Sequence, residues 1–247
     1  MRNGMGMGMA VGGGGAPAEW TPASLPAINA WFDAYDDSTI TKDGSNRVTE
    51  WRDKITGSTK KYTAAEATAP IHASGILTFD GSKFMTREHG LTSDNTNVTM
   101  LFVAKPSAFD TGGFQHFWGH AGSGSMTGYI ESTGNKVTLN GGAFIRQNTT
   151  ASTLLGNYHA YEFNHIPAGG SRVSVYSLVG GSDLSTSGSS GERTFNSANA
   201  LYLGSNTAPA LFFMGTIKCV ISVLGTIGVE DWALLKAWLI SYYGAAK

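Results

Sequence analysis

The chain has 247 residues, of which 14% are charged and 41% hydrophobic, and its formal net charge is -1. This composition argues against a disordered chain, and it lacks the clustered lysine and arginine that nucleic-acid binding needs. The length suits one large β domain or two small ones. A single cysteine, Cys219, rules out an intrachain disulfide framework. No apolar run reaches the roughly 18–20 residues of a membrane span, so no membrane partner is expected.

The chain begins with the glycine- and methionine-rich stretch MRNGMGMGMAVGGGG, residues 1–15. Its apolar part is too rich in glycine for the helix that a signal peptide forms. Ordering such a stretch costs much entropy, which contacts with neighbouring subunits would offset. Fully extended, it reaches about 50 Å. We therefore expect residues 1–27 to form an anchoring arm, and its expected partner-binding residues are Met5, Met7, Met9 and Val11.

Residues 28–247 are predicted to form one β domain, after a leader that Pro17, Pro22 and Pro26 keep extended. Short β segments with a turn at Asp43-Gly44 are expected first. Further strands are expected at 75–80, 97–105, 114–120, 127–132, 136–140, 143–148, 158–165, 171–179, 200–204 and 212–225. Many short strands separated by polar turns indicate a sandwich or a barrel. The polar stretch 180–199 is predicted to be a contact loop.

The C-terminal part supports two specific predictions. In the strand over 212–225, period-2 alternation places four side chains on one face: Ile217, Cys219, Ile221 and Val223. Cys219 is then an inert core thiol. Apolar residues at helical spacing predict one α-helix over 229–244 that packs a tryptophan stripe on the sandwich. Gly244 suits a left-handed cap at its end.

Several motifs together resemble a known family. They are WFDAYDDSTITKDGSNRVTEWRDK (31–54), ILTFDG (76–81), LYLG (201–204), GTIKCVISVLG (215–225) and VEDWALLKAWLISYYG (229–244). Over roughly residues 28–244 the chain resembles the concanavalin A-like, laminin-G-like jelly-roll domains, especially those of bacteriophage and bacterial surface proteins. The resemblance implies an all-β sandwich of two antiparallel sheets with one C-terminal α-helix, often with a concave binding face. The Gly-Met start resembles the N-termini of some phage structural proteins.

The first motif also has a physical interpretation of its own. Trp31 and Trp51 are large apolar anchors for the start of the core. Three carboxylates suit turn caps or calcium ligands, and turn capping is favoured because no EF-hand spacing is present: Asp33, Asp36 and Asp37. Asp80-Gly81 is interpreted as a tight turn rather than part of a calcium site. No cofactor is therefore expected, and calcium is the one alternative.

No catalytic motif is apparent in the sequence. Some jelly rolls of the resembled class are glycoside hydrolases that carry an E-x-D-x-x-E arrangement, whereas Glu131, Glu162 and Glu192 each lack a second acid at strand spacing. His116 and His120 lie in an expected strand, where four residues span about 13 Å, too far for one metal ion. His159 and His165 face the same problem. We therefore expect a protein that is not an enzyme.

Two functional hypotheses remain open. The first is a structural protein of a phage or phage-like particle, a capsid decoration, head spike or tail fibre. Its arm would bind other virion subunits in a homo-oligomer, and its domain would be exposed on the particle surface. The second is a carbohydrate-binding adhesin that recognises host-surface glycans. Aromatic and planar polar side chains of the middle strands are its candidate site: Trp118, Tyr129, Tyr158, Tyr161 and Asn164.

Overall fold

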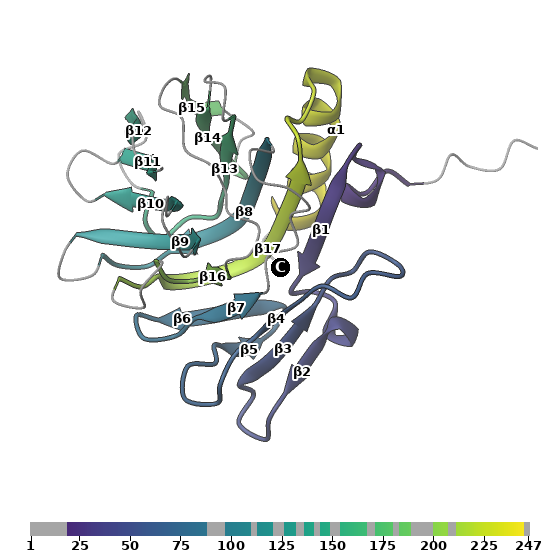
Figure 1. The fold of residues 1–247 in the computed structure, drawn as a ribbon, viewed down its shortest axis with the longest axis vertical. Helices are drawn as coiled ribbons and strands as arrows, with labels where there is room; N and C mark the ends of the chain where they lie inside the picture. The colour runs from purple at the N-terminus through teal and green to yellow at the C-terminus, as the bar shows by residue number, and fades with distance from the viewer. Residues whose placement is uncertain are drawn as a thin grey trace, which may run out of the picture.

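A computed structural model describes residues 19–87, 97–109, 113–120, 126–131, 136–140, 144–148, 154–166, 171–179, 183–188, 200–206 and 211–244. These residues form two antiparallel sheets and one C-terminal α-helix, α1 (Val229–Leu239), so the predicted sandwich is confirmed (Figure 1). The helix continues as a π-helical turn, η3 (Ile240–Gly244). No helix among the described residues is long and apolar enough to cross a membrane.

The first sheet has eight strands in the order β15-β14-β13-β8-β17-β6-β5, and β1 pairs with β17 beside β6. Along one edge, the long strand β17 pairs first with β6 and then with β1. The first and the last strand of the chain are therefore neighbours in this sheet. The strands are β1 (Ile28–Asp33), β5 (Ile71–Ala73), β6 (Ile76–Asp80), β8 (Val98–Pro106), β13 (His159–His165), β14 (Arg172–Ser177), β15 (Asp183–Gly188) and β17 (Met214–Leu224).

The second sheet has nine strands in the order β12-β11-β10-β9-β16-β7-β4-β3-β2. They are β2 (Ile40–Lys42), β3 (Val48–Arg52), β4 (Lys61–Thr63), β7 (Met85–Arg87), β9 (Phe114–His120), β10 (Met126–Glu131), β11 (Lys136–Asn140), β12 (Phe144–Asn148) and β16 (Leu201–Leu203). Two short 3-10 helices accompany the strands, η1 (Pro22–Ser24) and η2 (Asp37–Thr39). The turn at Asp43 is present, because the Asp43 carboxylate accepts hydrogen bonds from the Ser45 and Arg47 amides.

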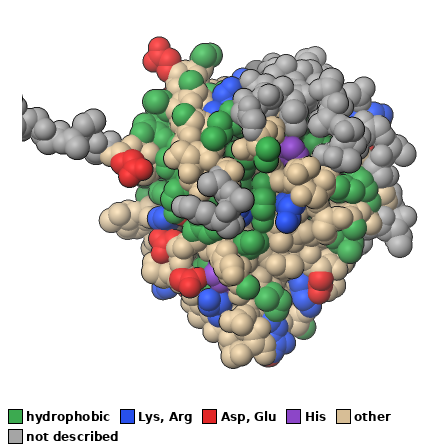
Figure 2. Space-filling model, turned by 180° about the vertical axis from the view of Figure 1, so that it is seen from behind, with side chains coloured by type: hydrophobic (Ala, Val, Ile, Leu, Met, Phe, Trp, Pro, Cys, Tyr) green, Lys and Arg blue, Asp and Glu red, His purple; other side chains and the backbone are tan. Residues whose placement is uncertain are grey.

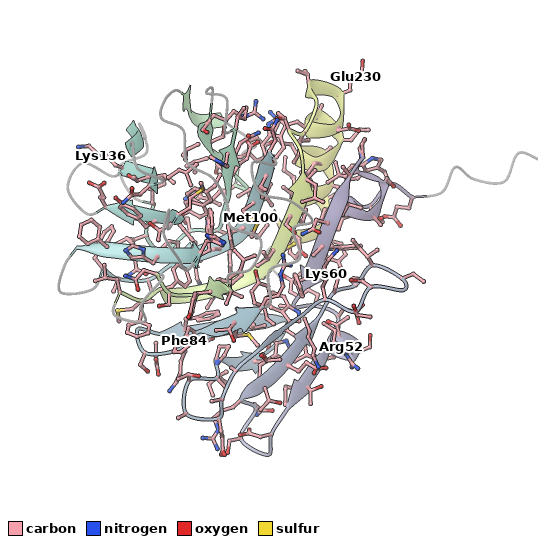
Figure 3. All side chains as sticks on the ribbon, in the orientation of Figure 1. Arg52, Lys60, Phe84, Met100, Lys136 and Glu230 are labelled. Atoms are coloured by element: carbon pink, nitrogen blue, oxygen red, sulfur yellow. The ribbon has the colours of Figure 1, made fainter. Side chains whose placement is uncertain are left out.

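Alternate side chains of the eight-stranded sheet enter two different cores. On β8, Met100 and Phe102 face the other sheet, whereas Leu101 and Val103 face the layer of α1. Figure 3 shows Met100 inside the molecule, while Arg52, Lys136 and Glu230 lie at its periphery. Trp31 and Trp51 are both buried as expected, but in different cores.

The outer core lies beneath the C-terminal helix. Trp238 of α1 meets Trp31 edge to face, with the ring centroids 5.5 Å apart. Trp232 packs on the same cluster, half-buried. The predicted packing of a tryptophan stripe on the sandwich is therefore confirmed.

Four local predictions are wrong. Ile217 faces the inner core, because a bulge between Ile217 and Cys219 reverses the alternation that holds for Cys219, Ile221 and Val223. Part of the expected loop 180–199 is the edge strand β15, which pairs with β14. Within the expected extended leader, Pro22–Ser24 form η1, because proline suits the first turn of a helix.

The fourth correction concerns Gly244, which is not a left-handed cap. Its φ is not positive, and it closes the π-helical turn η3. A Cβ at this position would lie 2.9 Å from the Leu178 carbonyl oxygen, so close approach of two backbones is what requires glycine here.

Charged side chains are sparse and mixed in sign. On the face seen in Figure 2, acidic and basic side chains are interspersed over the lower half rather than gathered by sign. Within the described residues of that face, no block of a single charge is presented to a partner.

Candidate functional site

The buried carboxylate of Asp33, at the end of β1, organises one corner of the outer core. Its Oδ1 accepts hydrogen bonds from the Tyr35 amide at 3.0 Å and from the Tyr243 hydroxyl at 2.9 Å. Its Oδ2 accepts from the Lys54 ammonium at 2.9 Å and from the Tyr242 hydroxyl at 3.0 Å. Asp33 was expected to cap a turn or to bind calcium. Its carboxylate accepts a hydrogen bond from the amide two residues further on, as a turn cap does, and also from two tyrosine hydroxyls near the C-terminal end of the domain.

Beside this network lies a pocket of about 620 Å³. We name it the Tyr35–Tyr242 pocket. Its lining residues are Tyr35, Asp37, Lys42, Asn46, His72, Ala73, Ser74, Gly75 and Tyr242. They come from the end of β1, η2, the β2–β3 hairpin, the β5–β6 hairpin and η3. The volume falls within the range of about 300–1,000 Å³ that is typical of small-molecule sites.

Two tyrosine rings form one wall of the pocket. The Tyr35 and Tyr242 ring centroids lie 5.8 Å apart with planes inclined by 52°. Behind Tyr242, the Trp238 ring stacks at 4.7 Å, and the Asp33 carboxylate holds the Tyr242 hydroxyl. Burial, and then the charge of Asp33, raise the pKa of Tyr242 to about 12. This ring is therefore fixed in position and keeps its proton at neutral pH.

The β5–β6 hairpin holds the Tyr35 ring from the other side. Its two turn residues, Ser74 and Gly75, have φ values of 51° and 72°. Positive φ at both central residues defines a type I′ turn, whose twist matches the flanking strands. A Cβ on Gly75 would lie 1.9 Å from Tyr35 Cδ1. Glycine is thus required at position 75 for two reasons: the positive φ of the turn and the close contact with the Tyr35 ring.

The polar edge of the pocket is formed by three side chains. His72 is buried, and its Nε2 lies 2.9 Å from the Ala34 carbonyl oxygen. Because a carbonyl accepts only, Nε2 carries the hydrogen, and a neutral ring presents the Nδ1 lone pair to Lys42 Nζ at 3.2 Å. Asp37 Oδ1 lies 3.7 Å from the same ammonium and is largely exposed. The edge thus offers a carboxylate and an ammonium to a ligand.

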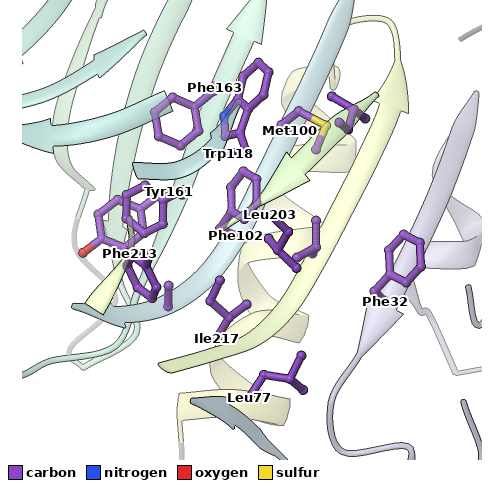
Figure 4. Close-up of a cluster of buried hydrophobic side chains, with 14 of the residues drawn as sticks. Phe32, Leu77, Met100, Phe102, Trp118, Tyr161, Phe163, Leu203, Phe213 and Ile217 are labelled. Carbon is purple, nitrogen blue, oxygen red and sulfur yellow. The ribbon is translucent and has the colours of Figure 1, made fainter. Parts of the chain in front are cut away.

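The middle-strand residues expected to bind carbohydrate lie elsewhere. Trp118 and Tyr161 belong to the core between the sheets, among Phe163, Phe102 and Phe213 (Figure 4). Tyr129 and Asn164 are also buried. Because Trp118 and Tyr161 fill the core between the sheets, their rings offer no open face to a sugar. Tyr158 is half-buried on the outer side of the eight-stranded sheet.

The partner-binding residues expected in the arm, Met5, Met7, Met9 and Val11, lie outside the described residues. The acids considered for catalysis are buried where they are described. Glu131 accepts a hydrogen bond from Thr138, and Glu162 pairs with Arg172 at 2.8 Å. Glu192 lies outside the described residues. In the described part of the chain, no group of three or more His, Cys, Asp or Glu side chains is placed to hold a metal ion.

The aspartates considered as calcium ligands make turn contacts. Asp36 caps η2 by accepting from the Ser38 amide at 3.2 Å. Asp80 accepts from the Ser82 amide at 3.0 Å, next to Gly81 with a φ of 87°. Both agree with the turn interpretation.

Sequence reasoning missed the pocket because its residues are far apart in the chain. Tyr242 and Asp33 are separated by 209 positions. One local signal was present, since Ser74-Gly75 between two strand-like segments is typical of a hairpin turn. That signal would have located one side of the site and none of its partners.

No family model and no curated protein matches the sequence. Solved structures do match in fold. A GH54 α-L-arabinofuranosidase aligns with a TM-score of 0.64 and 12% identity over 90% of this chain and 60% of that one. Domain 4 of AbnA, a GH43 extracellular arabinanase from Geobacillus stearothermophilus in complex with arabinotriose, gives 0.52 and 15% over 86% and 98%.

The sialidase of Trypanosoma rangeli also matches, with a TM-score of 0.55 and 12% identity over 90% of this chain. The chain spans only 34% of the sialidase. At these identities the matches show the fold alone. That fold is a β-sandwich shared with domains of carbohydrate-active proteins, which agrees with the sandwich that the sequence predicts.

Proposed function

We propose that this domain binds carbohydrate, without cleaving it, in the Tyr35–Tyr242 pocket. The observation that carries the proposal is the combination of two fixed tyrosine rings with a carboxylate, an amide and an ammonium around about 620 Å³. The C–H face of a sugar ring packs on aromatic rings, and its hydroxyls exchange hydrogen bonds with such polar groups. Support from the fold comes from its sandwich neighbours, one of which was solved with arabinotriose.

The absence of cleavage is part of the proposal. Canonical glycoside hydrolysis uses two carboxyl groups flanking the scissile bond. Among the described residues that line the pocket, Asp37 is the one carboxylate, and it interacts with Lys42. Asp33, the nearest buried acid, is fully engaged with four donors. The site is therefore equipped to hold a sugar rather than to activate water.

A glycan array on the full chain, followed by titration calorimetry on each hit, tests the proposal. Tyr35→Leu removes an aromatic wall and Asp37→Ala removes the exposed carboxylate, and each is expected to weaken binding about tenfold or more. Trp232→Leu and Asp231→Ala are matched controls: a half-buried ring and a first-turn acid outside the pocket. A silent array on folded protein, or equal losses in the controls, would contradict the proposal.

A role on a phage or phage-like particle remains a second proposal, carried by the sequence of the arm. The Gly-Met stretch of residues 1–15 suits an anchor among virion subunits, and the jelly-roll domain would then face outward and bind host glycans. Deletion of residues 1–15 should abolish incorporation into particles while leaving the domain folded. Full incorporation of the truncated chain would rule out the anchor.

A further inference from the structure

Lys218 occupies an unusual position in β17. The register of β17 on β8 passes from Ile217 opposite Ala104 to Cys219 opposite Val103, which leaves Lys218 as the extra residue of a bulge. Bulges re-aim a side chain and recur next to functional sites. Lys218 is only 2% exposed, although it is a lysine on a sheet. A buried lysine is rare unless it is paired.

The neighbours of Lys218 are aromatic and cationic. Its Nζ lies 4.0 Å from the centroid of the Tyr158 ring and 5.3 Å from that of Tyr35. Lys105 Nζ lies 5.1 Å from the same Tyr158 centroid. The Tyr158 hydroxyl is held by Thr216 Oγ1 at 2.9 Å. Two ammonium groups thus share one tyrosine ring that is itself fixed.

Neither ammonium has a counter-ion in the described part of the chain, unlike Lys54, which pairs with Asp33 and Asp36. Burial, and then the charge of Lys105, lower the pKa of Lys218. Cation–π contacts recover part of the lost hydration, but the charge of Lys105 still disfavours the charge of Lys218. An anion that pairs with both ammonium groups would relieve both costs.

We infer that Lys105 and Lys218, arranged around Tyr158, bind an oxyanion, a carboxylate or sulfate group carried by an acidic sugar. The inference rests on the proposed function, because Tyr35 belongs both to the Tyr35–Tyr242 pocket and to the surroundings of Lys218. A sugar ring in the pocket would then contact Tyr35 on one side, and an acidic substituent would reach past Tyr35 to the lysines. The expected class of ligand is thereby narrowed from carbohydrates in general to acidic carbohydrates.

The fold itself gains little from this arrangement. An apolar side chain of similar length at this position would remove the desolvation cost of the unpaired ammonium. Lys218→Met is therefore expected to unfold at the same temperature as the wild type or higher. A residue that costs stability and is nevertheless present is typical of a binding site.

The test uses the full chain at low ionic strength, where charge interactions are least screened. Sodium sulfate is titrated while the Lys218 and Lys105 side-chain methylene signals are followed by NMR. Affinities for glucuronate and for glucose are then compared in the wild type, Lys218→Met and Lys236→Met. Lys236 is the matched control, because it also lies over aromatic rings, Tyr176 and Trp232, but on α1.

The inference predicts saturable sulfate shifts at Lys218 and a preference for glucuronate of about tenfold, both lost in Lys218→Met and kept in Lys236→Met. Equal affinity for the two sugars in the wild type, without saturable sulfate shifts, overturns it and leaves the proposed function standing. Saturable sulfate binding that needs Lys218, with no binding of either sugar or of any array glycan, supports the oxyanion site and instead overturns the proposed function.

Discussion

The Asp33 carboxylate accepts a hydrogen bond from the Tyr242 hydroxyl at 3.0 Å, joining residues 209 positions apart. The same carboxylate accepts a hydrogen bond from the Tyr35 amide, so one buried acid positions both tyrosines of the aromatic wall. The motif at the start of the domain and the tyrosine pair Tyr242 and Tyr243 after α1 therefore build the same site. Loss of the Asp33 carboxylate is therefore expected to reduce both the stability of the domain and its binding of glycans.

Asp33→Ala should lower the free energy of unfolding by about 3–5 kcal/mol, because it leaves the Lys54 ammonium and three further donors without their acceptor. Chemical denaturation measures the loss. Asp36→Ala is the matched control, since Asp36 also pairs with Lys54, at 3.3 Å, but is partly exposed. That control should cost about 1–2 kcal/mol, because it loses the cap of η2 together with a partly exposed ion pair. Equal effects of the two substitutions would contradict the role given to Asp33.

Gly75→Ala should be more harmful than Gly57→Ala. Both glycines have positive φ, 72° and 79°, so both substitutions carry the same backbone strain. Only at Gly75 would the new Cβ meet the Tyr35 ring, whereas Gly57 has open space around it. Thermal unfolding of the pair isolates the contact with the ring. Gly75→Ala should also weaken glycan binding, and indistinguishable variants would show that Tyr35 is not held by the hairpin.

Acid should destabilise the domain through His159. Burial lowers the pKa of His159 to about 4 from an ordinary 6.5. The unfolded chain therefore takes up a proton first as the pH falls from 6.5 to 4, and stability declines over that window. Between pH 7 and pH 5 the loss is about 2 kcal/mol. His159→Gln should flatten the pH dependence of unfolding, and an unchanged slope would exclude His159 as its source.

Cys219 should resist thiol reagents in the native state. It is fully buried, and burial, with the charge of Asp33 second, raises its pKa far above the ordinary value. Because the thiolate is the nucleophile, iodoacetamide at pH 8 should label the chain only after unfolding. Mass spectrometry with and without denaturant measures this. Rapid labelling of the native chain would contradict the inert core thiol.

Most strand positions were predictable because they depend on local periodicity, whereas the edge strand β15 lies in a polar stretch predicted to be a loop. The same rule placed Ile217 on the wrong face, because the bulge at Lys218 interrupts the alternation along β17. It also could not show that Trp118 and Tyr161 alternate inward. An aromatic ring faces the core only if the second sheet packs on its side of the strand. The sequence of a single strand does not show on which side that sheet lies.

The pocket was less predictable than the fold. Asp33 was expected to cap a turn or bind calcium, and both interpretations used only its nearest neighbours in sequence. Its partners Tyr242 and Tyr243 arrive through the pairing of β1 with β17 and the packing of α1. Long-range pairing of this kind leaves no mark on the spacing of residues.

The proposed function requires a sugar to bind in the Tyr35–Tyr242 pocket, against the wall that the two tyrosine rings form. Its most direct test is a backbone and aromatic NMR titration of the full chain with a glycan that the array identifies. Saturable shifts are expected at five residues that line the pocket: Tyr35, Asn46, His72, Gly75 and Tyr242. Shifts confined to the nine-stranded sheet, with these five residues unmoved, would contradict it.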